Sequence, residues 1–119
     1  DFWGLTASDG PGWTTRRVRG AERRFFDYVA RGAPYGPDDG TVAPWAVVAS
    51  LPFAPEIVLP TIRRFQDVYP QVTGEYCFRC SFNLTFPGDG DAGAGWTSPY
   101  HFGINLGPVV LMYENYRSV

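Results

Sequence analysis

Hydrophobic residues gather in three segments of the chain, and the first segment predicts a helix over residues 41–51. Its central run, residues 45–49, is apolar on every side, as in a helix that is buried all round. Thr41 is the expected N-cap, and Pro44 suits the first turn because that position needs no backbone N–H. Pro52 ends the predicted helix.

The second segment predicts an amphipathic helix over residues 55–69. Pro60 lies within it and would remove one helical hydrogen bond, at a cost of about 3 kcal/mol in a helix interior. This proline therefore either kinks the helix or marks its first turn. The apolar side chains that recur at helical spacing are Val58, Ile62, Phe65 and Tyr69.

The third segment predicts a helix that begins at Gly107–Pro108 and runs to Tyr116. Its first half is again apolar on every side, which predicts burial. Two helices buried all round and one amphipathic helix cannot cover one another. We therefore expect partner helices outside this chain.

The stretches between these helices, residues 1–40 and 71–106, hold 13 of the 14 glycines and five of the 11 prolines in the 119 residues. They predict long loops, with one possible strand over residues 24–29. Loops of this length in a compact domain are usually functional. The expected fold class is mainly α with minor β-strand content.

The charge pattern excludes some partners. The net charge is -2, which argues against nucleic acid. A basic run, Arg16 to Arg24, is interrupted by Glu22 and predicts a solvated face. No stretch approaches the roughly 20 apolar residues that a membrane span requires.

The two cysteines, Cys77 and Cys80, form a single Cys-x-x-Cys. A zinc site needs two further ligands, and His101 is the one histidine. Idle or locally bridged thiols are the favoured interpretation, with a redox or metal role as the alternative. We expect no metal site.

Acids and aromatic residues in and beside the loops suit carbohydrate chemistry. Hydrolysis of a glycosidic bond uses one carboxyl group to protonate the leaving oxygen and another to activate water or attack carbon. Aromatic rings bury the apolar faces of pyranose units. The candidates are Asp9, Asp39 and Glu56 for the carboxyl groups, and Trp3, Tyr35, Trp45 and Tyr100 for the rings.

Each candidate also has a structural interpretation. Asp9 and Asp39 each precede a glycine, a common turn pair. Glu56 suits the first turn of a helix through the helix dipole. Tryptophans are more often core residues than sugar platforms. Asn83-Leu-Thr85 matches a glycosylation sequon, a match that is frequent by chance.

Four motifs are spaced along the chain. They are Phe2-Trp-Gly-Leu-Thr-Ala-Ser-Asp-Gly-Pro11, Asp39-Gly-Thr-Val-Ala-Pro44, Ala49-Ser-Leu-Pro-Phe-Ala-Pro-Glu56 and Gly107-Pro-Val-Val-Leu-Met-Tyr-Glu-Asn-Tyr-Arg117. Together they resemble the closing third of the glucoamylase-like (glycoamylase) domain of bacterial endo-β-1,2-glucanases and cyclic β-1,2-glucan synthases. They occur in the order of that family and cover nearly the whole chain.

The resemblance implies that residues 1–119 are the C-terminal part of one catalytic domain, incomplete at both ends, with the fold of an (α/α)6 toroid. It implies hydrolysis or transglycosylation of β-1,2-linked glucans, without a metal or organic cofactor. The partners would be a glucan and the missing N-terminal part of the domain, which supplies some of the acid and base groups. The substrate suggests a periplasmic or extracellular location.

The resemblance also implies cleft roles for Asp9, Asp39 and Glu56, with one departure at Asn105. Many relatives have Gly-Ile-Asp-Gln-Gly-Pro where this chain has Gly103-Ile-Asn-Leu-Gly-Pro108. Asparagine cannot accept a proton as a base does. The alternative function is therefore a non-catalytic glucan-binding or architectural domain.

Overall fold

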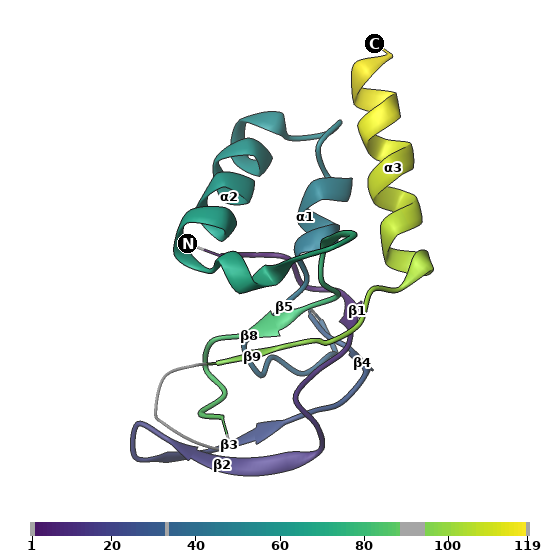
Figure 1. Ribbon diagram of the computed structural model, residues 1–119. Helices are drawn as coiled ribbons and strands as arrows, with labels where there is room; N and C mark the ends of the chain where they lie inside the picture. The colour runs from purple at the N-terminus through teal and green to yellow at the C-terminus, as the bar shows by residue number, and fades with distance from the viewer. Residues whose placement is uncertain (1, 33, 89–94, 119) are drawn as a thin grey trace.

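The structure is a computed structural model, and it describes residues 2–32, 34–88 and 95–118. The helices lie at one end of the molecule and most of the strands at the other, with α1 between α2 and α3 (Figure 1). The helices are α1 (Pro44–Ala49), α2 (Pro55–Val68), the short 3-10 helix η1 (Pro70–Val72) and α3 (Gly103–Arg117).

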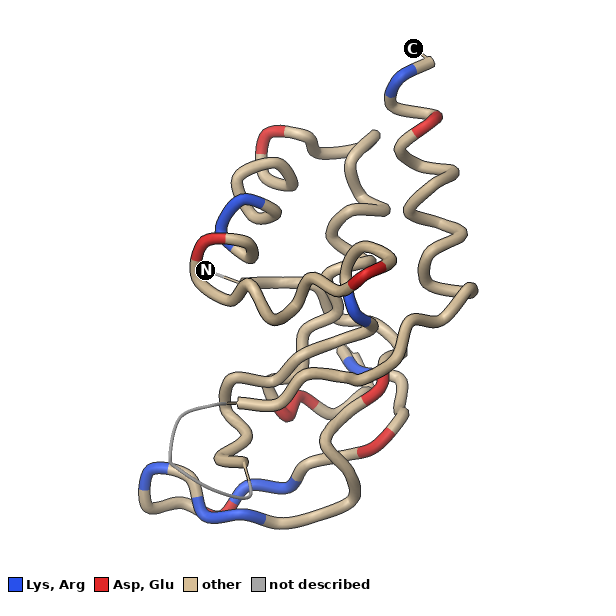
Figure 2. Tube along the Cα trace, in the orientation of Figure 1, with Lys and Arg blue, Asp and Glu red and all other residues tan. Residues whose placement is uncertain are grey.

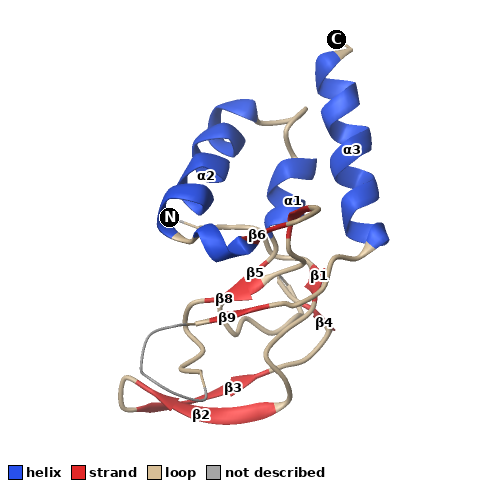
Figure 3. Cartoon of the chain, viewed as in Figure 1, coloured by secondary structure: helices blue, strands red, loops and turns tan. Residues whose placement is uncertain are grey.

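The strands of the described ranges are short and pair antiparallel in four small sheets (Figure 3). The pairs are β1 (Ala7–Ser8) with β4 (Val29–Ala30), β2 (Thr14–Val18) with β3 (Ala21–Phe25), and β6 (Thr73–Gly74) with β7 (Cys77–Phe78). The fourth sheet has three strands, with β8 (Phe82–Asn83) between β5 (Thr41–Val42) and β9 (Trp96–Thr97).

The expectation of a mainly α fold is wrong for this chain, whose described residues are 35% helical and 22% strand. Most strands have two residues, too few to show the alternation that marks a strand in a sequence. The strand expected over residues 24–29 falls across the end of β3 and the start of β4. The six helical hairpins of a toroid are not contained in this chain, whose described residues form three α-helices.

The three predicted helices are present with altered limits. α2 ends one residue before the expected position, and Pro60 lies inside it. α1 is shorter than expected, and its N-cap is Ala43. Thr41 is instead a buried residue of β5. α3 begins at Gly103, so Pro108 lies inside the helix and does not open it.

The expected burial of α3 is not observed within this chain. Asn105 is its buried residue, whereas Ile104, Val110 and Leu111 are 77%, 61% and 63% exposed. α3 packs against α1 and leaves its other sides uncovered. No helix in the ranges 2–32, 34–88 and 95–118 is long and apolar enough to cross a lipid bilayer.

The hydrophobic core lies where α1 and α2 meet the strands, and Phe65 of α2 is at its centre. Phe65 is completely buried, and its ring stacks on Phe2 with 5.3 Å between ring centroids. The rings of Phe82 and Phe78 approach it edge-on, at 5.6 Å and 6.2 Å between centroids. This aromatic group joins α2 to the N-terminal segment and to strands β7 and β8.

Replacement of this central ring tests the core. We expect Phe65→Ala to lower the free energy of unfolding by about 3–5 kcal/mol, because it removes buried apolar area and leaves a cavity. Phe53→Ala is the matched control, since Phe53 is 79% exposed, and it should change stability by less than about 0.5 kcal/mol. Urea unfolding followed by tryptophan fluorescence measures both. Equal losses in the two variants would contradict this description of the core.

Candidate functional site

Eight buried polar residues lie together below the helices, and we call them the polar cluster. Segments far apart in the sequence contribute to it, since Asp9 contacts a residue 89 positions further along the chain. Such a group must satisfy its own hydrogen bonds, because water does not reach it. The members are Ser8, Asp9, Arg31, Asp39, Thr41, Ser81, Asn83 and Ser98.

An ion pair between Arg31 and Asp39 forms the centre of the polar cluster. Arg31 Nε donates to Asp39 Oδ1 at 2.9 Å, and its Nη2 donates to Oδ2 at 3.1 Å. Both side chains are fully buried. The backbone N–H groups of Phe26 and Thr41 donate to the same carboxylate, each at 3.1 Å. All four acceptor positions of a carboxylate are therefore used.

The remaining guanidinium N–H groups of Arg31 bind backbone carbonyls. Nη1 donates to the carbonyl of Ser8, and Nη2 donates to those of Phe26 and Asp27, both at 3.0 Å. Gly10 makes this approach possible, because a Cβ there would lie 2.2 Å from Arg31 Nη2 and 2.1 Å from the carbonyl oxygen of Phe26. The Asp9–Gly10 pair thus needs its glycine for close packing.

The electrostatics favour an ionised Asp39. Burial alone would raise the pKa of Asp39, but the hydrogen bonds from Arg31 and Thr41, the charge of Arg31 and the N–H of Phe26 outweigh it. Together they hold the pKa of Asp39 below its ordinary value of 3.8. A carboxylate that is ionised and fully hydrogen-bonded is poorly suited to proton transfer. The geometry favours a structural role for Asp39, and the catalytic role stays a prediction.

Asp9 is also fixed within the polar cluster. Ser98 Oγ donates to Asp9 Oδ2, and Ser81 Oγ donates to the main-chain carbonyl of Asp9, both at 2.7 Å. Ser98 Oγ in turn accepts the N–H of Tyr100 at 3.2 Å. Asp9 is 8% exposed and so has little access to solvent.

Asn83 satisfies both ends of its side-chain amide inside the protein. Its Nδ2 donates to the carbonyl of Asp39 at 2.9 Å and to Thr41 Oγ1 at 3.0 Å. Its Oδ1 accepts the N–H groups of Thr85 and Phe86. Because Asn83 is 0% exposed, the sequon that it opens is not accessible for glycosylation in the folded protein.

Asn105 lies near the start of α3, 4% exposed, and its Nδ2 donates to Cys80 Sγ at 3.1 Å. The N–H of Cys80 donates to the carbonyl of Tyr100 at 3.1 Å, which links Asn105 to the polar cluster. Cys77 is exposed, and both cysteines are free thiols. The described residues include no group of three or more side chains that could bind a metal ion.

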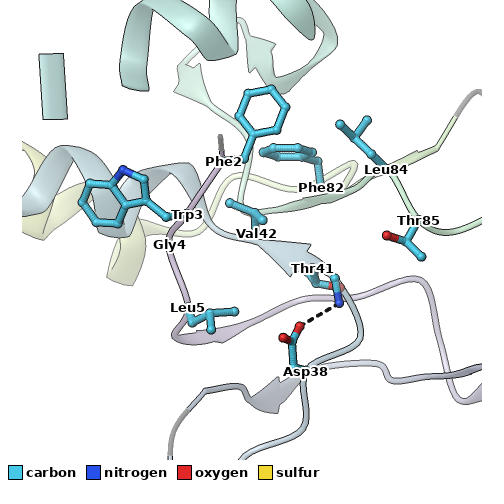
Figure 4. Close-up of a pocket in the computed structure, with 11 residues that line it drawn as sticks. Phe2, Trp3, Gly4, Leu5, Asp38, Thr41, Val42, Phe82, Leu84 and Thr85 are labelled. Atoms are coloured by element: carbon cyan, nitrogen blue, oxygen red, sulfur yellow. Dashed lines mark hydrogen bonds between the residues drawn. The ribbon is translucent and has the colours of Figure 1, made fainter. Parts of the chain in front are cut away.

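A hollow of about 680 Å³ lies beside the polar cluster, and we call it the aromatic hollow (Figure 4). The indole N–H of Trp3 donates to Thr61 Oγ1 at 2.7 Å, which fixes the ring at its wall. Asp38 reaches the opposite side, where its Oδ1 accepts the N–H of Gly40 at 3.1 Å. Apolar rings facing a carboxylate suit a sugar, which has apolar faces and polar edges. The walls include Phe2, Trp3, Leu5, Asp38, Val42 and Phe82.

The other predicted residues lie outside the aromatic hollow. Glu56 is exposed in the first turn of α2, at the end of the helix away from most of the strands (Figure 1). Tyr35 is 96% exposed and Tyr100 is 56% exposed. Trp45 is on α1, and its buried indole N–H has no hydrogen-bond partner among the described residues. Trp3 is thus the one predicted site residue in the aromatic hollow.

Sequence reasoning did not select Arg31 or Asp38 as site residues. Arg31 gives no local signal, because its role depends on carbonyls and a carboxylate that only the fold brings near it. Asp38 is not among the predicted carboxyl groups, although it is adjacent to Asp39 in the sequence. Two adjacent acids before Gly40 were the signal that could have identified Asp38. In the structure, Asp39 is buried, whereas the carboxylate of Asp38 is exposed and accepts the N–H of Gly40.

Comparison with known proteins then identifies the family. A family model, Glycoamylase, described as "Putative glucoamylase", matches residues 1–119. The chain belongs to this family. It is 35% identical, over 99% of its length, to an exo-β-1,2-glucooligosaccharide sophorohydrolase (non-reducing end) of Parabacteroides distasonis.

Solved structures of two β-1,2-glucanases are similar in fold to this chain. A β-1,2-glucanase of Parabacteroides distasonis has a TM-score of 0.73 and 35% identity, over 99% of this chain. An endo-β-1,2-glucanase of Chitinophaga pinensis, in complex with sophorotriose and glucose, has a TM-score of 0.67 and 27% identity, over 98% of this chain. The chain spans only 14% of the sophorohydrolase and 23% of the Chitinophaga enzyme.

Removal of the buried arginine tests the polar cluster. We expect Arg31→Ala to lower the free energy of unfolding by about 3–5 kcal/mol, because it leaves Asp39 charged, buried and unpaired. The control is Arg117→Ala, which breaks an exposed ion pair with Glu114 and should cost at most about 1 kcal/mol. Denaturant unfolding at neutral pH measures both losses. Similar losses would mean that the Arg31–Asp39 pair does not stabilise the fold.

The lowered pKa of Asp39 predicts an acid-dependent contribution to stability. Because its folded-state pKa is below the unfolded value of 3.8, this contribution is fully present above pH 3.8 and is lost as the pH falls through the folded pKa. Asp39→Asn should therefore be destabilised relative to the unmodified protein at pH 6, and by less at pH 3. Asp67→Asn, at an exposed position of α2, is the control, and its difference in stability from the unmodified protein should be the same at pH 6 and pH 3. The prediction would be contradicted if the stability lost in Asp39→Asn were also the same at both pH values.

Proposed function

We propose that this chain forms part of a glycoside hydrolase that acts on β-1,2-linked glucans. The observation that carries the proposal is the match along nearly the whole chain to relatives named for β-1,2-glucan hydrolysis. Because the chain spans a small share of those relatives, the activity is proposed for the intact protein. We expect it to act in the periplasm or outside the cell, where a polysaccharide substrate is available.

The aromatic hollow is the proposed contact with the glucan. The ring of Trp3 is fixed by its hydrogen bond to Thr61 and offers an apolar surface to a pyranose unit. Asp38 is exposed at the same hollow and can accept hydrogen bonds from sugar hydroxyl groups. The neighbouring Asp39 is fixed by Arg31, so the backbone that carries Asp38 is held in place.

Acid and base catalysis by two carboxyl groups is the proposed chemistry. The carboxylates of Asp9 and Asp39 are buried and hydrogen-bonded within the polar cluster, and Glu56 lies outside the aromatic hollow. The rest of the domain is therefore expected to supply at least part of the pair. The exposed apolar residues of α3 would contact that same remainder, which gives them the burial that their sequence predicts.

Asn105 favours a second candidate function, a non-catalytic glucan-binding or architectural domain. By the resemblance, it occupies a position at which many relatives have an aspartate, and its amide donates a hydrogen bond to Cys80 Sγ. An amide cannot act as a general base.

The substitution Asn105→Asp in the intact protein distinguishes the two functions. The first turn of α3 favours a negative charge, and the thiol of Cys80 can donate a hydrogen bond to the new carboxylate. We expect the rate of β-1,2-glucan hydrolysis to rise at least about tenfold, toward the gains that general acid–base groups supply. Release of reducing sugar from β-1,2-glucan, with β-1,3-glucan as the comparison substrate, measures the rate.

Asn115→Asp is the matched control, since it makes the same charge change at an exposed position of α3, and its rate should not change. Turnover in the unmodified protein supports the hydrolase. Tight glucan binding without turnover, in both the unmodified protein and the Asn105→Asp variant, would instead support the binding domain.

A further inference from the structure

The β2–β3 hairpin concentrates positive charge at the end of the molecule opposite the helices (Figure 2). Half of the ten basic residues of the chain lie within residues 16–24, and the one acid among them is Glu22. The protein as a whole has a net charge of -2, so this concentration is local. A surface of this kind attracts anions within about a Debye length, or roughly 10 Å at 0.1 M salt.

A second hollow, of about 690 Å³, lies between this hairpin and residues 84–87, and we call it the arginine hollow. Its lining includes Arg17, Arg19 and Arg23, and it includes no acidic side chain among the described residues. Within the described part of the chain, no ion pair joins any of these three arginines to an acid. Among the described residues, their guanidinium groups thus have no acidic partner.

The position of Arg19 costs the hairpin stability, which indicates a role for its side chain. Val18 pairs with Ala21, so Arg19 and Gly20 form a two-residue turn, with φ angles of 50° and 84°. Such a turn favours Asn-Gly, because residues other than glycine and asparagine rarely adopt a positive φ. Strain of this kind is often found at functional sites.

The arginine hollow lies next to the aromatic hollow, because Leu84 and Thr85 line both of them. A glycan that extends from the aromatic hollow past these two residues would bring a further unit to the arginines. A neutral glucan offers no charge to three arginines that have no acidic partner in the described ranges, whereas an anionic group does.

We propose that the arginine hollow binds a carboxylate or phosphate group carried by the glycan that occupies the aromatic hollow. The inference rests on the proposed glucan function for the occupant of the aromatic hollow. Both anions match the planar fork of the guanidinium group, which donates two parallel hydrogen bonds. The hairpin would then select substituted glycans over neutral ones.

Binding of three matched probes to the intact protein tests the proposal. The probes are a neutral β-1,2-gluco-oligosaccharide, the same oligosaccharide carrying succinyl half-esters, and the same oligosaccharide carrying a phosphate monoester. Isothermal titration at 50 mM and 200 mM salt gives the dissociation constants. We expect at least one anionic probe to bind about tenfold more tightly than the neutral one at low salt, with the advantage reduced at high salt. The anionic probe that gains more identifies the substituent.

The double variant Arg17→Gln/Arg23→Gln should abolish this advantage and leave the neutral probe unchanged. Arg63→Gln/Arg64→Gln is the matched control, since it removes the same charge from exposed positions of α2 and should keep the advantage. Arg19→Asn separates binding from folding. It suits the turn, so the Tm should rise while the affinity for the anionic probe falls.

Equal binding of neutral and anionic probes would overturn the inference, and hydrolysis of the neutral glucan in the same protein would leave the proposed function intact. An equal loss in the two double variants would also overturn it, because the effect would then be one of net charge. Phosphatidylglycerol vesicles that bind as tightly as the anionic probes would assign the hairpin to a membrane surface instead. If no probe binds and no glucan is hydrolysed, both proposals fail.

Discussion

The buried ion pair between Arg31 and Asp39 is the interaction on which the strand end of the molecule depends. The strands that it joins, β1, β4 and β5, have two residues each and share few ladder hydrogen bonds. Arg31 binds a carbonyl of β1, and Asp39 binds the N–H at the start of β5. One buried pair thus provides the connections that longer strands would make through their backbones. Removal of either partner would leave a charge without compensation.

The ion pair with Arg31 also gives the adjacent residues Asp38 and Asp39 different roles. Asp39 is 3% exposed and uses its whole carboxylate within the protein, whereas Asp38 is exposed at the aromatic hollow. A buried, rigid residue next to an exposed one limits the entropy that the exposed side chain loses on binding. Thr41 contributes to the polar cluster and to the aromatic hollow, since its N–H donates to Asp39 and the residue also lines the hollow. Residues 38–41 therefore include groups that stabilise the fold and groups that face the proposed ligand.

The sequence predicts the parts of this structure that depend on local periodicity. The spacing of Val58 and Phe65 locates α2 to within one residue at its C-terminal end, because an amphipathic helix records its buried face in its sequence. Two-residue strands leave no such record, so the strand content was underestimated. The role of Arg31 depends on contacts across the fold and was missed for the same reason. The motifs correctly indicated the family, although only the structure shows that Asn105 contacts Cys80.

The interactions offered by the two neighbouring hollows differ in range, so each would contribute to a different stage of glycan binding. Stacking on Trp3 requires direct contact and therefore discriminates shape. Attraction by the arginines of the hairpin extends over several ångströms and decreases with salt. A charged glycan would first be attracted by the hairpin and then oriented by the ring of Trp3. Leu84 and Thr85, which line both hollows, lie between the two places. A neutral glucan would have only the second interaction, so the hairpin would affect the association rate more than the geometry of the bound sugar.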